Sequence, residues 1–388
     1  MKKKISLIAI TLLFVFASAV QAAPAKAQAS IRVYLDGQEI KFQAPPVMKN
    51  GVTFVQFRPL FQALDYSVQW NNTNKQVTGT YIDQKLQMTI GQKTAYVNGV
   101  KTTLEIAPFT ESGNTLVPLR FVAEATGLPV KWDQKARTIH IDRQGAIDKA
   151  EAAATKLYQA LDAAETAKNL ELAKQSILPK SPALAYQQEL YDEQFKRDLK
   201  VSSRVLEVTV AGSSIHAFTA RSFERVSGPF SWDATIYYES LLKKDAGGNW
   251  KLHDINEYDM EYLVSDELLD AKPNVPENVQ KAISETIDTQ YKGFNDEDGP
   301  LLMSVIHPES SFYDIFKTSI DEGIFDEVNF NLKAEVIRTI FHQGDDAVLY
   351  IEEVDDADGD MFYSTSLYWL KQSGGKWLIY DVLELDIL

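Results

Sequence analysis

The sequence contains no cysteine among its 388 residues. This absence excludes a disulfide framework, a thiol nucleophile and a lipid anchor attached to an N-terminal cysteine. It does not argue against export, because a chain of this length can bury a sizeable core without cross-links. Histidine is also scarce, with five residues that stand singly along the chain. The sequence therefore lacks the clustered imidazoles that copper chemistry requires.

Long apolar runs are missing after the N-terminus. The chain begins with a basic stretch, an apolar segment over residues 5–20 and small residues that favour cleavage after Ala22, or alternatively after Ala29. We therefore predict a signal peptide at 1–22, a leader remnant or linker at 23–30, and a secreted mature protein. The apolar segment is shorter than the roughly 20 residues of a membrane span, so no span is expected in the mature form.

Positive charge is scarce in most of the chain. Residues 144–388 hold 22 Lys and Arg against 45 Asp and Glu, whereas residues 30–143 hold 13 against 9. The net charges are −23 and +4, and the whole chain carries −15. This balance excludes nucleic acid as a partner, because phosphate contacts need basic patches. The +4 region either faces anionic polymers of a bacterial envelope or reflects ordinary scatter.

What the sequence does contain is an internal repeat with an offset of 62 residues. "VQFRPLFQALDYSVQW" returns as "VPLRFVAEATGLPVKW", which places Arg58 on Arg120 and Trp70 on Trp132. A constant offset through turns and apolar runs indicates duplication. We call residues 31–143 the repeat domain, with two 62-residue repeats. One copy cannot bury its apolar face alone, so we expect the two to share a core.

Each copy is predicted to form a hairpin, a strand, a short helix and a second hairpin. Asp-Gly and Asn-Gly, at positions 36–37 and 98–99, favour tight hairpin turns. Asp65 and Gly127 are expected to end the short helices in a left-handed conformation. The second helix should direct Phe121, Val122 and Ala125 inward.

The tandem pattern "VPLR…A…GLPVKWD…RTI" resembles the stalk domain of secreted Gram-positive proteins, catalogued as copper amine oxidase N-terminal-like. The resemblance implies a β-rich domain at the cell envelope and does not imply copper. In amine oxidases the metal and the tyrosine-derived quinone belong to a separate catalytic domain. The quinone motif Asn-Tyr-Asp/Glu is missing here, since Asn256 to Asp259 reads "NEYD". We expect no metal and no cofactor.

The remaining chain contains the same order of elements twice, over 146–265 and 276–388, with a linker at 266–275. An Ala-rich helix with a stripe of Ala150, Ala154, Leu157 and Leu161 is predicted to continue to Pro179. An irregular stretch and four alternating strands follow, and after the linker come a second helix and four more strands. Both halves end in a Gly-Gly turn and a tryptophan. We call these halves the first and second modules.

Helices followed by antiparallel strands indicate an α+β fold. The strand, Gly-Gly turn and "W-L--D" ending resembles the NTF2-like family, in which helices cover a curved sheet and leave a cone-shaped hollow. The fold class is thus α+β, with a duplicated β-rich domain and two helix-over-sheet modules. Aromatic residues on the sheets could line a small-molecule pocket: Trp232, Tyr237, Tyr238, Tyr363, Tyr368 and Trp369.

Other candidate residues have a structural alternative. Arg58 and Arg120 could bind wall phosphates or brace loop carbonyls, and the donor fork of arginine favours bracing. Trp70 and Trp132 could stack on sugars, but their strand positions favour the core. The carboxylates of 355–360 could bind calcium, but they depart from the EF-hand spacing, which favours a solvated hairpin tip.

Enzymes of the NTF2-like family use an Asp, His or Tyr as acid or base. His253-Asp254 and Tyr380-Asp381 are adjacent on strands and face opposite ways, so we predict no catalytic residue and no enzymatic activity. The sequence favours an exported, envelope-associated protein whose partner is a wall polymer or an envelope protein. The alternatives are a protein that binds a small ligand in its cones, and an isomerase or hydrolase.

Overall fold

The computed structural model describes residues 30–327, 330–357 and 360–387. The predicted signal peptide and most of the linker after it lie outside the described residues. The chain forms two compact units, one built from the repeat domain up to Asp142 and one from Arg143 onward, with two short loop segments of the repeat domain grouped with the second unit. Among the helices of the described part, none is long and apolar enough to cross a membrane.

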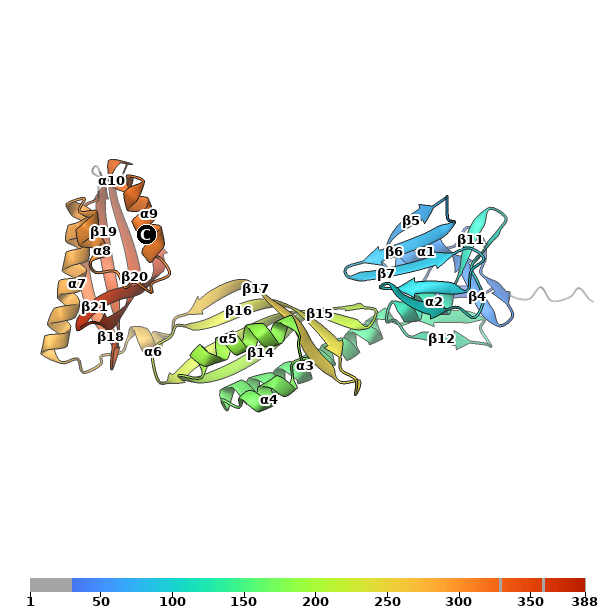
Figure 1. Cartoon of the computed structure of the whole chain (residues 1–388), viewed down its shortest axis with the longest axis horizontal. Coiled ribbons are helices and arrows are strands. Elements are labelled where there is room, and N and C mark those ends of the chain that lie inside the picture. The colour runs from blue at the N-terminus through green and yellow to red at the C-terminus, as the bar shows by residue number, and fades with distance from the viewer. Residues whose placement is uncertain (1–29, 328–329, 358–359, 388) are drawn as a thin grey trace, which may run out of the picture. The chain divides into compact units, whose positions relative to one another are not determined.

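The repeat domain consists of short strands and two seven-residue helices (Figure 1). The first copy contains β1 (Arg32–Leu35), β2 (Gln38–Glu39), β3 (Val47–Lys49), β4 (Val52–Gln56), α1 (Phe57–Ala63), β5 (Ser67–Asn71), β6 (Gln76–Tyr81) and β7 (Gln84–Thr89). The second contains β8 (Thr94–Val97), β9 (Val100–Thr103), β10 (Phe109–Glu111), β11 (Asn114–Pro118), α2 (Leu119–Ala125), β12 (Val130–Asp133) and β13 (Thr138–Ile141). In each copy the helix is preceded by a two-stranded hairpin, β3-β4 or β10-β11, where we expected a single strand.

The two copies share all three sheets of the repeat domain. Their strand orders are β12-β13-β1-β2, β10-β11-β4-β3 and β5-β6-β7-β8-β9. The first strand of copy one pairs in parallel with the last strand of copy two, with Val33 opposite Ile139. In the central sheet Val117 lies opposite Val55, its counterpart in the repeat. Every sheet thus needs both copies, as expected for a shared core.

The turn chemistry matches the sequence. Asp36 and Gly37 have positive φ, as do Asn98 and Gly99, and both short helices end at left-handed residues, Asp65 and Gly127. These turns are confirmed because Asp, Asn and Gly tolerate this conformation.

The inward face of α2 was predicted only in part. Val122 is fully buried, but Leu119 and Ala123 complete the buried face, while Phe121 and Ala125 are half-buried. Because α2 is only seven residues long, the direction of the preceding strand sets its rotation.

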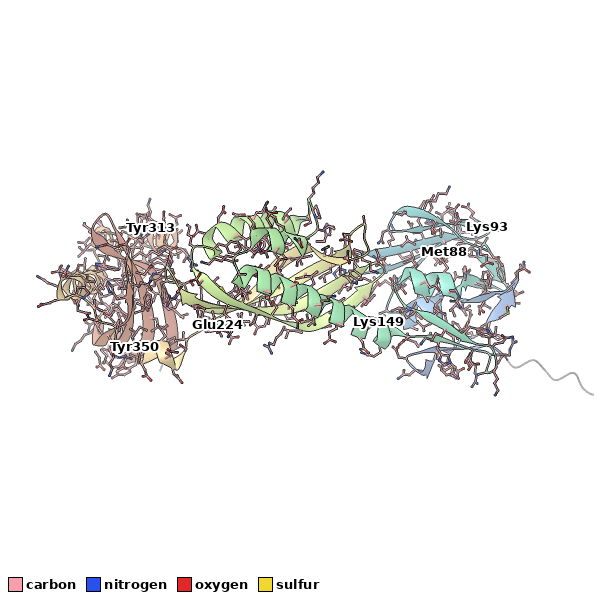
Figure 2. All side chains as sticks on the ribbon, turned by 90° about the horizontal axis from the view of Figure 1, so that it is seen from below. Met88, Lys93, Lys149, Glu224, Tyr313 and Tyr350 are labelled. Carbon is pink, nitrogen blue, oxygen red and sulfur yellow. The ribbon has the colours of Figure 1, made fainter. Side chains whose placement is uncertain are left out.

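The pseudo-symmetry of the copies is broken by β7. In one outer sheet β13 pairs directly with β1, whereas in the other β7 lies between β6 and β8. The positions that would match β7 in copy two, 62 residues later, lie in helix α3 (Arg143–Thr166). One face of β7 enters the core, and Met88 is buried there while the nearby Lys93 is exposed (Figure 2). The inserted strand widens the outer sheet of copy one to five strands.

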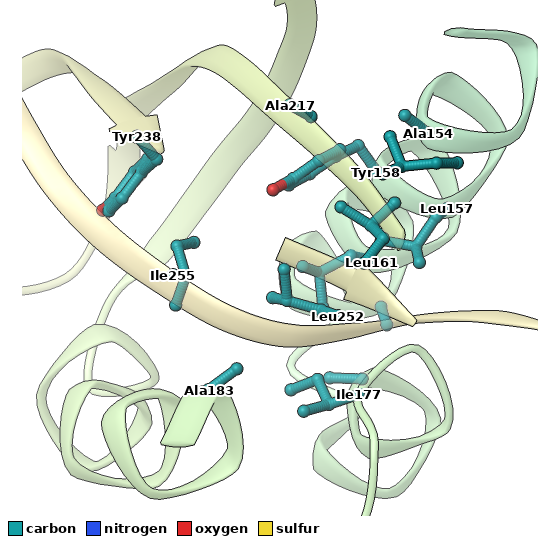
Figure 3. Close-up of a cluster of buried hydrophobic side chains, with 14 of the residues drawn as sticks. Ala154, Leu157, Tyr158, Leu161, Ile177, Ala183, Ala217, Tyr238, Leu252 and Ile255 are labelled. Atoms are coloured by element: carbon teal, nitrogen blue, oxygen red, sulfur yellow. The ribbon is translucent and has the colours of Figure 1, made fainter. Parts of the chain in front are cut away.

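The first module places helices over a four-stranded antiparallel sheet. Its elements are α3, α4 (Leu170–Gln175), α5 (Pro182–Gln194), β14 (Asp198–Ala211), β15 (Ser214–Ser227), β16 (Asp233–Lys244) and β17 (Trp250–Leu263). The predicted stripe on α3 is buried and packs against Ile215, Leu242, Leu252 and Ile255 of the sheet (Figure 3).

The helical region differs from our prediction in two respects. α3 ends at Thr166 rather than continuing to Pro179, because Lys168 adopts positive φ and the Asn169 side chain caps α4. The stretch expected to be irregular forms α5, whose N-terminus combines a Ser181 cap with Pro182 in the first turn.

The second module has the same topology. Its elements are α7 (Glu277–Asn295), α8 (Gly299–Met303), α9 (Tyr313–Asp321), α10 (Ile324–Glu327), β18 (Leu332–Gln343), β19 (Asp346–Ala357), β20 (Asp360–Ser373) and β21 (Lys376–Ile387). Both modules bulge at the same two places of the third strand pair, after Tyr237 and Leu241 in one and after Thr365 and Trp369 in the other. The α+β prediction is confirmed.

The sheet of the second module is buried on both faces. One face packs against Ile283 and Ile287 of α7. The other carries Val348, Leu367 and Trp369, and it packs against Phe230 of the β15–β16 loop and residues near α6 (Asp266–Leu269). Apolar residues on both faces of these strands are explained by this double burial.

Candidate functional site

A groove of about 460 Å³ opens beside α1 in the repeat domain. Its lining is rich in amides, with two aromatic rings and one cation: Gln43, Gln56, Phe57, Arg58, Pro59, Gln62, Trp70, Gly113, Asn114 and Thr115. Both copies of the repeat contribute, so the groove exists only when they fold together.

The floor of the groove is fixed by Gln56, a buried residue at the end of β4. Its Nε2 donates to Asn114 Oδ1 at 2.7 Å, and its Oε1 accepts from the backbone N–H of Ala44 at 3.0 Å. Phe57 and Trp70 form the apolar wall, with ring centroids 6.3 Å apart. A side chain held at both ends cannot swing into the opening, so the groove is formed in advance of any ligand.

Arg58 lies at the mouth of this groove. It is the second residue of α1, its side chain is exposed, and its guanidinium lies 5.3 Å from the centroid of the Phe57 ring. Among the described residues it forms no ion pair. A cation without a carboxylate partner beside donor and acceptor amides is suited to an anionic, hydroxylated ligand.

Arg120, its counterpart in the second copy, has a different environment. Its Nη1 donates to the backbone carbonyl of Val130 at 3.4 Å, as expected of a brace. The position that matches Gln56 is Pro118, which has no side-chain donor to build a groove floor. The repeat therefore carries one open arginine and one that contacts the backbone.

The two tryptophans of the repeat are half-buried rather than fully in the core. Trp70 lines two grooves, the one at Arg58 and a second of about 650 Å³ on the outer sheet. Its ring is therefore held by the domain and still reaches the surface.

The aromatic candidates of the modules do not line one shared pocket. Trp232 donates from Nε1 to Asp381 at 2.8 Å and packs on Trp369, so it joins the two modules. Tyr237 lies on the outer face of its sheet, stacked on Phe218, and Tyr363 is exposed near the start of β20. Only Tyr368 and Tyr238 lie in a helix-covered interior.

The interior of the first module is occupied by a buried ion cluster. Arg221, 1% exposed, donates from Nη2 to Asp162 at 2.9 Å and to Glu165 at 2.7 Å. Burial lowers the pKa of Arg221, but the charges of Glu165 and Asp162 outweigh it and hold the pKa above its usual range. Tyr191 and Ser203 complete the hydrogen bonds of the two carboxylates.

The second module has a carboxylate at the equivalent position. Arg221 pairs with Ile236 of β16, which lies eight residues before Lys244, the partner of Trp250. Glu353 pairs with Ser364 of β20, which likewise lies eight residues before Gln372, the partner of Trp377. Glu353 accepts from the hydroxyls of Tyr291 at 2.5 Å and Tyr368 at 2.8 Å. Burial is the largest cause that raises the pKa of both tyrosines. The Tyr368 phenol and then the Glu353 charge raise the pKa of Tyr291 further, and the Glu353 charge raises that of Tyr368.

The adjacent pairs on the last strands do not form acid–base dyads. Asp254 accepts from its neighbour's backbone N–H, and Asp381 accepts from Trp232 and from the N–H of Val382. Burial lowers the pKa of His253. Among the described residues no group of three metal-ligating side chains occurs. The side chains of Asp355–Asp360, the calcium candidate, lie outside the described residues.

Sequence reasoning missed the two interior clusters and the Gln56 floor. The sequence does contain a signal for Arg221. It lies at even spacing from Ala217 and Phe223 along β15, which places all three on the inward face of the strand. Asp162 and Glu165 lie three residues apart on the buried side of α3, which also indicates a paired cation. Nothing in the sequence of Gln56 indicates that its amide reaches Asn114 of the other copy.

Comparisons with known proteins agree with this description of the repeat domain. Residues 34–141 match the family described as copper amine oxidase N-terminal domain. A search of curated proteins gave no match.

Solved structures that resemble parts of the chain include an NTF2-like protein involved in plasmid conjugation, with 11% identity, a TM-score of 0.26, and coverage of 62% of this chain and 96% of the other. Bd1075 from Bdellovibrio bacteriovorus has 11% identity and a TM-score of 0.25, and the match covers 36% of this chain and about half, 48%, of that one. The dehydrochlorinase LinA-type3 from Novosphingobium barchaimii LL02 has 10% identity and a TM-score of 0.23, covering 28% and 88%.

Proposed function

We propose that this protein is exported and associates with the bacterial cell envelope through its repeat domain, which carries two non-enzymatic interaction modules. The observation that carries the proposal is the contrast between open and closed polar groups. Arg58 is exposed beside a preformed groove, whereas Arg221 inside the first module is paired with two carboxylates and Glu353 inside the second accepts from two phenols. We therefore assign binding of the envelope to the surface of the repeat domain.

Charge supports the same assignment. The repeat domain is net positive and the rest of the chain is strongly negative, so an anionic wall polymer is attracted by one and repelled by the other. The groove at Arg58 offers that polymer a guanidinium fork for phosphate or carboxylate oxygens and amides for hydroxyl groups.

The small-ligand and enzyme alternatives require free polar groups in the modules. Arg221 and Glu353 lie in the interiors of the two modules, and each is held by two partners from other elements. A ligand would have to displace an ion pair or two tyrosine hydrogen bonds, which favours the envelope proposal over both alternatives.

The test is co-sedimentation of the mature chain with isolated Gram-positive cell walls at low and high salt. We expect binding at low salt that Arg58→Glu weakens several-fold, because the substitution reverses the charge at the groove. Lys135→Glu is the matched control, since it makes the same charge change at an exposed position away from the groove.

Equal losses in the two variants would mean that net charge, and not the groove, attaches the protein. No sedimentation at any salt would refute envelope association. N-terminal sequencing of material secreted by a Gram-positive host tests export, for which we expect a start at Ala23, after cleavage at Ala22.

A further inference from the structure

The outer sheet of the first copy has an exposed face on which amide and hydroxyl side chains predominate. Gln69 and Asn71 on β5 lie opposite Thr78 and Gln76 on β6, and Gln87 on β7 continues the row. This face forms a groove of about 650 Å³ whose lining, all within the described residues, holds five amides, two threonines, Trp70 and Lys85 but no aspartate or glutamate. Such a face is unusual in a chain of net charge −15.

The amides are partly held in place and keep unused hydrogen-bonding groups. Gln87 Nε2 donates to Gln76 Oε1 at 3.2 Å, and Gln76 Nε2 donates to Thr89 at 3.4 Å. Asn71 Oδ1 accepts two backbone N–H groups of the following turn. Each side-chain amide has two donor hydrogens and two acceptor lone pairs, so both donors and acceptors are left over along the row.

Aromatic residues border this row at both ends. Tyr96 on β8, paired with Gln87, is 38% exposed on the same face. Trp70 borders the groove on the edge strand β5, where it alternates with Gln69 and Asn71 and its ring packs toward Phe57. At about 4.8 Å between strands, the distance from β5 to β8 is about 14 Å. An exposed ring beside a row of amides matches a molecule that has apolar faces and a hydroxyl rim.

The second copy shows that the fold does not require these residues. Gln69, Asn71 and Thr78 correspond to Lys131, Asp133 and His140. Asp133 performs the turn role of Asn71, because its Oδ1 accepts from the N–H of Ala136 at 2.9 Å. The neutral amide at 71 therefore serves something other than the turn.

The counterpart of Tyr96 in the other outer sheet, β12-β13-β1-β2, is occupied. Tyr34 is stacked by His140, with ring centroids 5.2 Å apart and an interplanar angle of 11°, and the Arg32 guanidinium lies 5.8 Å from its ring centroid. Of the two outer sheets of the described repeat domain, the sheet of β5 to β9 combines an exposed ring with a row of neutral amides.

We infer that this face, which we call the amide face (Gln69, Trp70, Asn71, Gln76, Thr78, Gln87 and Tyr96), binds a neutral oligosaccharide chain. Sugar hydroxyls both donate and accept, as side-chain amides do, and an aromatic ring can pack on the apolar face of a sugar ring. The groove lining holds one lysine, Lys85, and Lys101 lies opposite Tyr96, whereas the guanidinium of Arg58 lies in the neighbouring groove. The inference deepens the proposed envelope association by adding a contact that does not depend on charge.

The test is isothermal titration of the mature chain with two soluble neutral probes, a β-1,4-linked N-acetylglucosamine hexamer and maltohexaose, in about 1 M NaCl, where charge interactions are screened within about 3 Å. We expect at least one probe to bind with submillimolar to millimolar affinity. The double variant Gln69→Lys, Asn71→Asp installs the residues of copy two, keeps the turn acceptor, and should weaken binding at least tenfold.

The reciprocal variant Lys131→Gln, Asp133→Asn is the matched control and should bind as the unmodified protein does. Thermal melting checks that both variants fold. If neither sugar binds at millimolar concentration, or if the amide-face variant binds as well as the control, the inference is wrong. This outcome is separate from wall association through Arg58, which is measured at low salt on intact walls.

Discussion

At the scale of single residues, the two modules each hold a charged side chain in their interior, but with different kinds of partner. Arg221 and Glu353 occupy equivalent buried positions, yet one is paired with two carboxylates and the other accepts from two phenols. A buried charge is tolerated only when its partners are complete. Each cluster is therefore sensitive to the loss of any one member.

We predict that Arg221→Leu destabilises the first module by about 3–5 kcal/mol, because it leaves Asp162 and Glu165 buried without their cation. Adding Asp162→Asn and Glu165→Gln should recover most of this loss. Arg204→Leu, at an exposed position of β14, should change stability by less than about 0.5 kcal/mol. Chemical denaturation measures all three, and a triple variant no more stable than the single one would contradict the cluster's role.

The second module should lose stability at alkaline pH. The pKa values of Tyr291 and Tyr368 are raised in the folded state, mainly by burial, so the folded chain keeps these protons after the unfolded chain has released them. Their contribution is complete below the ordinary pKa of about 10 and is lost as the pH rises above it. Unfolding free energies measured from pH 9 to 12 should fall, and a double Tyr→Phe variant should fall less steeply.

At the scale of elements, each copy of the repeat packs its short helix against the adjacent hairpin. In copy one the large side chain comes from the helix and the small one from the strand, and in copy two the reverse holds. In copy one Phe61 of α1 meets Gly79 of β6, where an added Cβ would lie 2.1 Å from the Phe61 ring. The corresponding positions in copy two hold Ala123 and Ile141, both fully buried. The same volume is filled from the helix in one copy and from the strand in the other.

We predict that Gly79→Ile alone disrupts the repeat domain and that Phe61→Ala alone destabilises it by about 3–5 kcal/mol. The double variant installs the side chains of copy two and should be more stable than either single variant. Melting temperatures decide this, and strictly additive losses would show that the two positions do not share one volume.

At the scale of the whole molecule, charge is divided between the parts of the chain. The +4 region coincides with the unit that carries the Arg58 groove, and the −23 region coincides with the modules. A division of this kind affects association with charged polymers rather than the fold.

We therefore predict that residues 30–143 alone bind isolated walls more tightly than the mature chain does, because the acidic modules no longer oppose binding. The difference should shrink with salt, since charges are screened over about 8 Å at physiological ionic strength. Sedimentation isotherms at several salt concentrations measure it. Tighter binding by the mature chain would assign wall recognition to the modules.

The sequence by itself determined much of the repeat domain and the α+β class. A constant 62-residue offset and residues that tolerate positive φ act locally, so hairpin turns and the ends of the short helices could be predicted. Strand alternation likewise gave all eight strands of the modules to within a few residues.

Only the tertiary structure decided how the copies interlock and which polar groups stay open. The parallel pairing of β1 with β13, the bond from Gln56 to Asn114 and the partners of Arg221 all join residues distant in sequence. Local propensity carries no information about such pairs. Arg58 and Arg120 occupy matching positions of the sequence repeat, and they differ because the tertiary structure places one beside a groove and the carbonyl of Val130 beside the other.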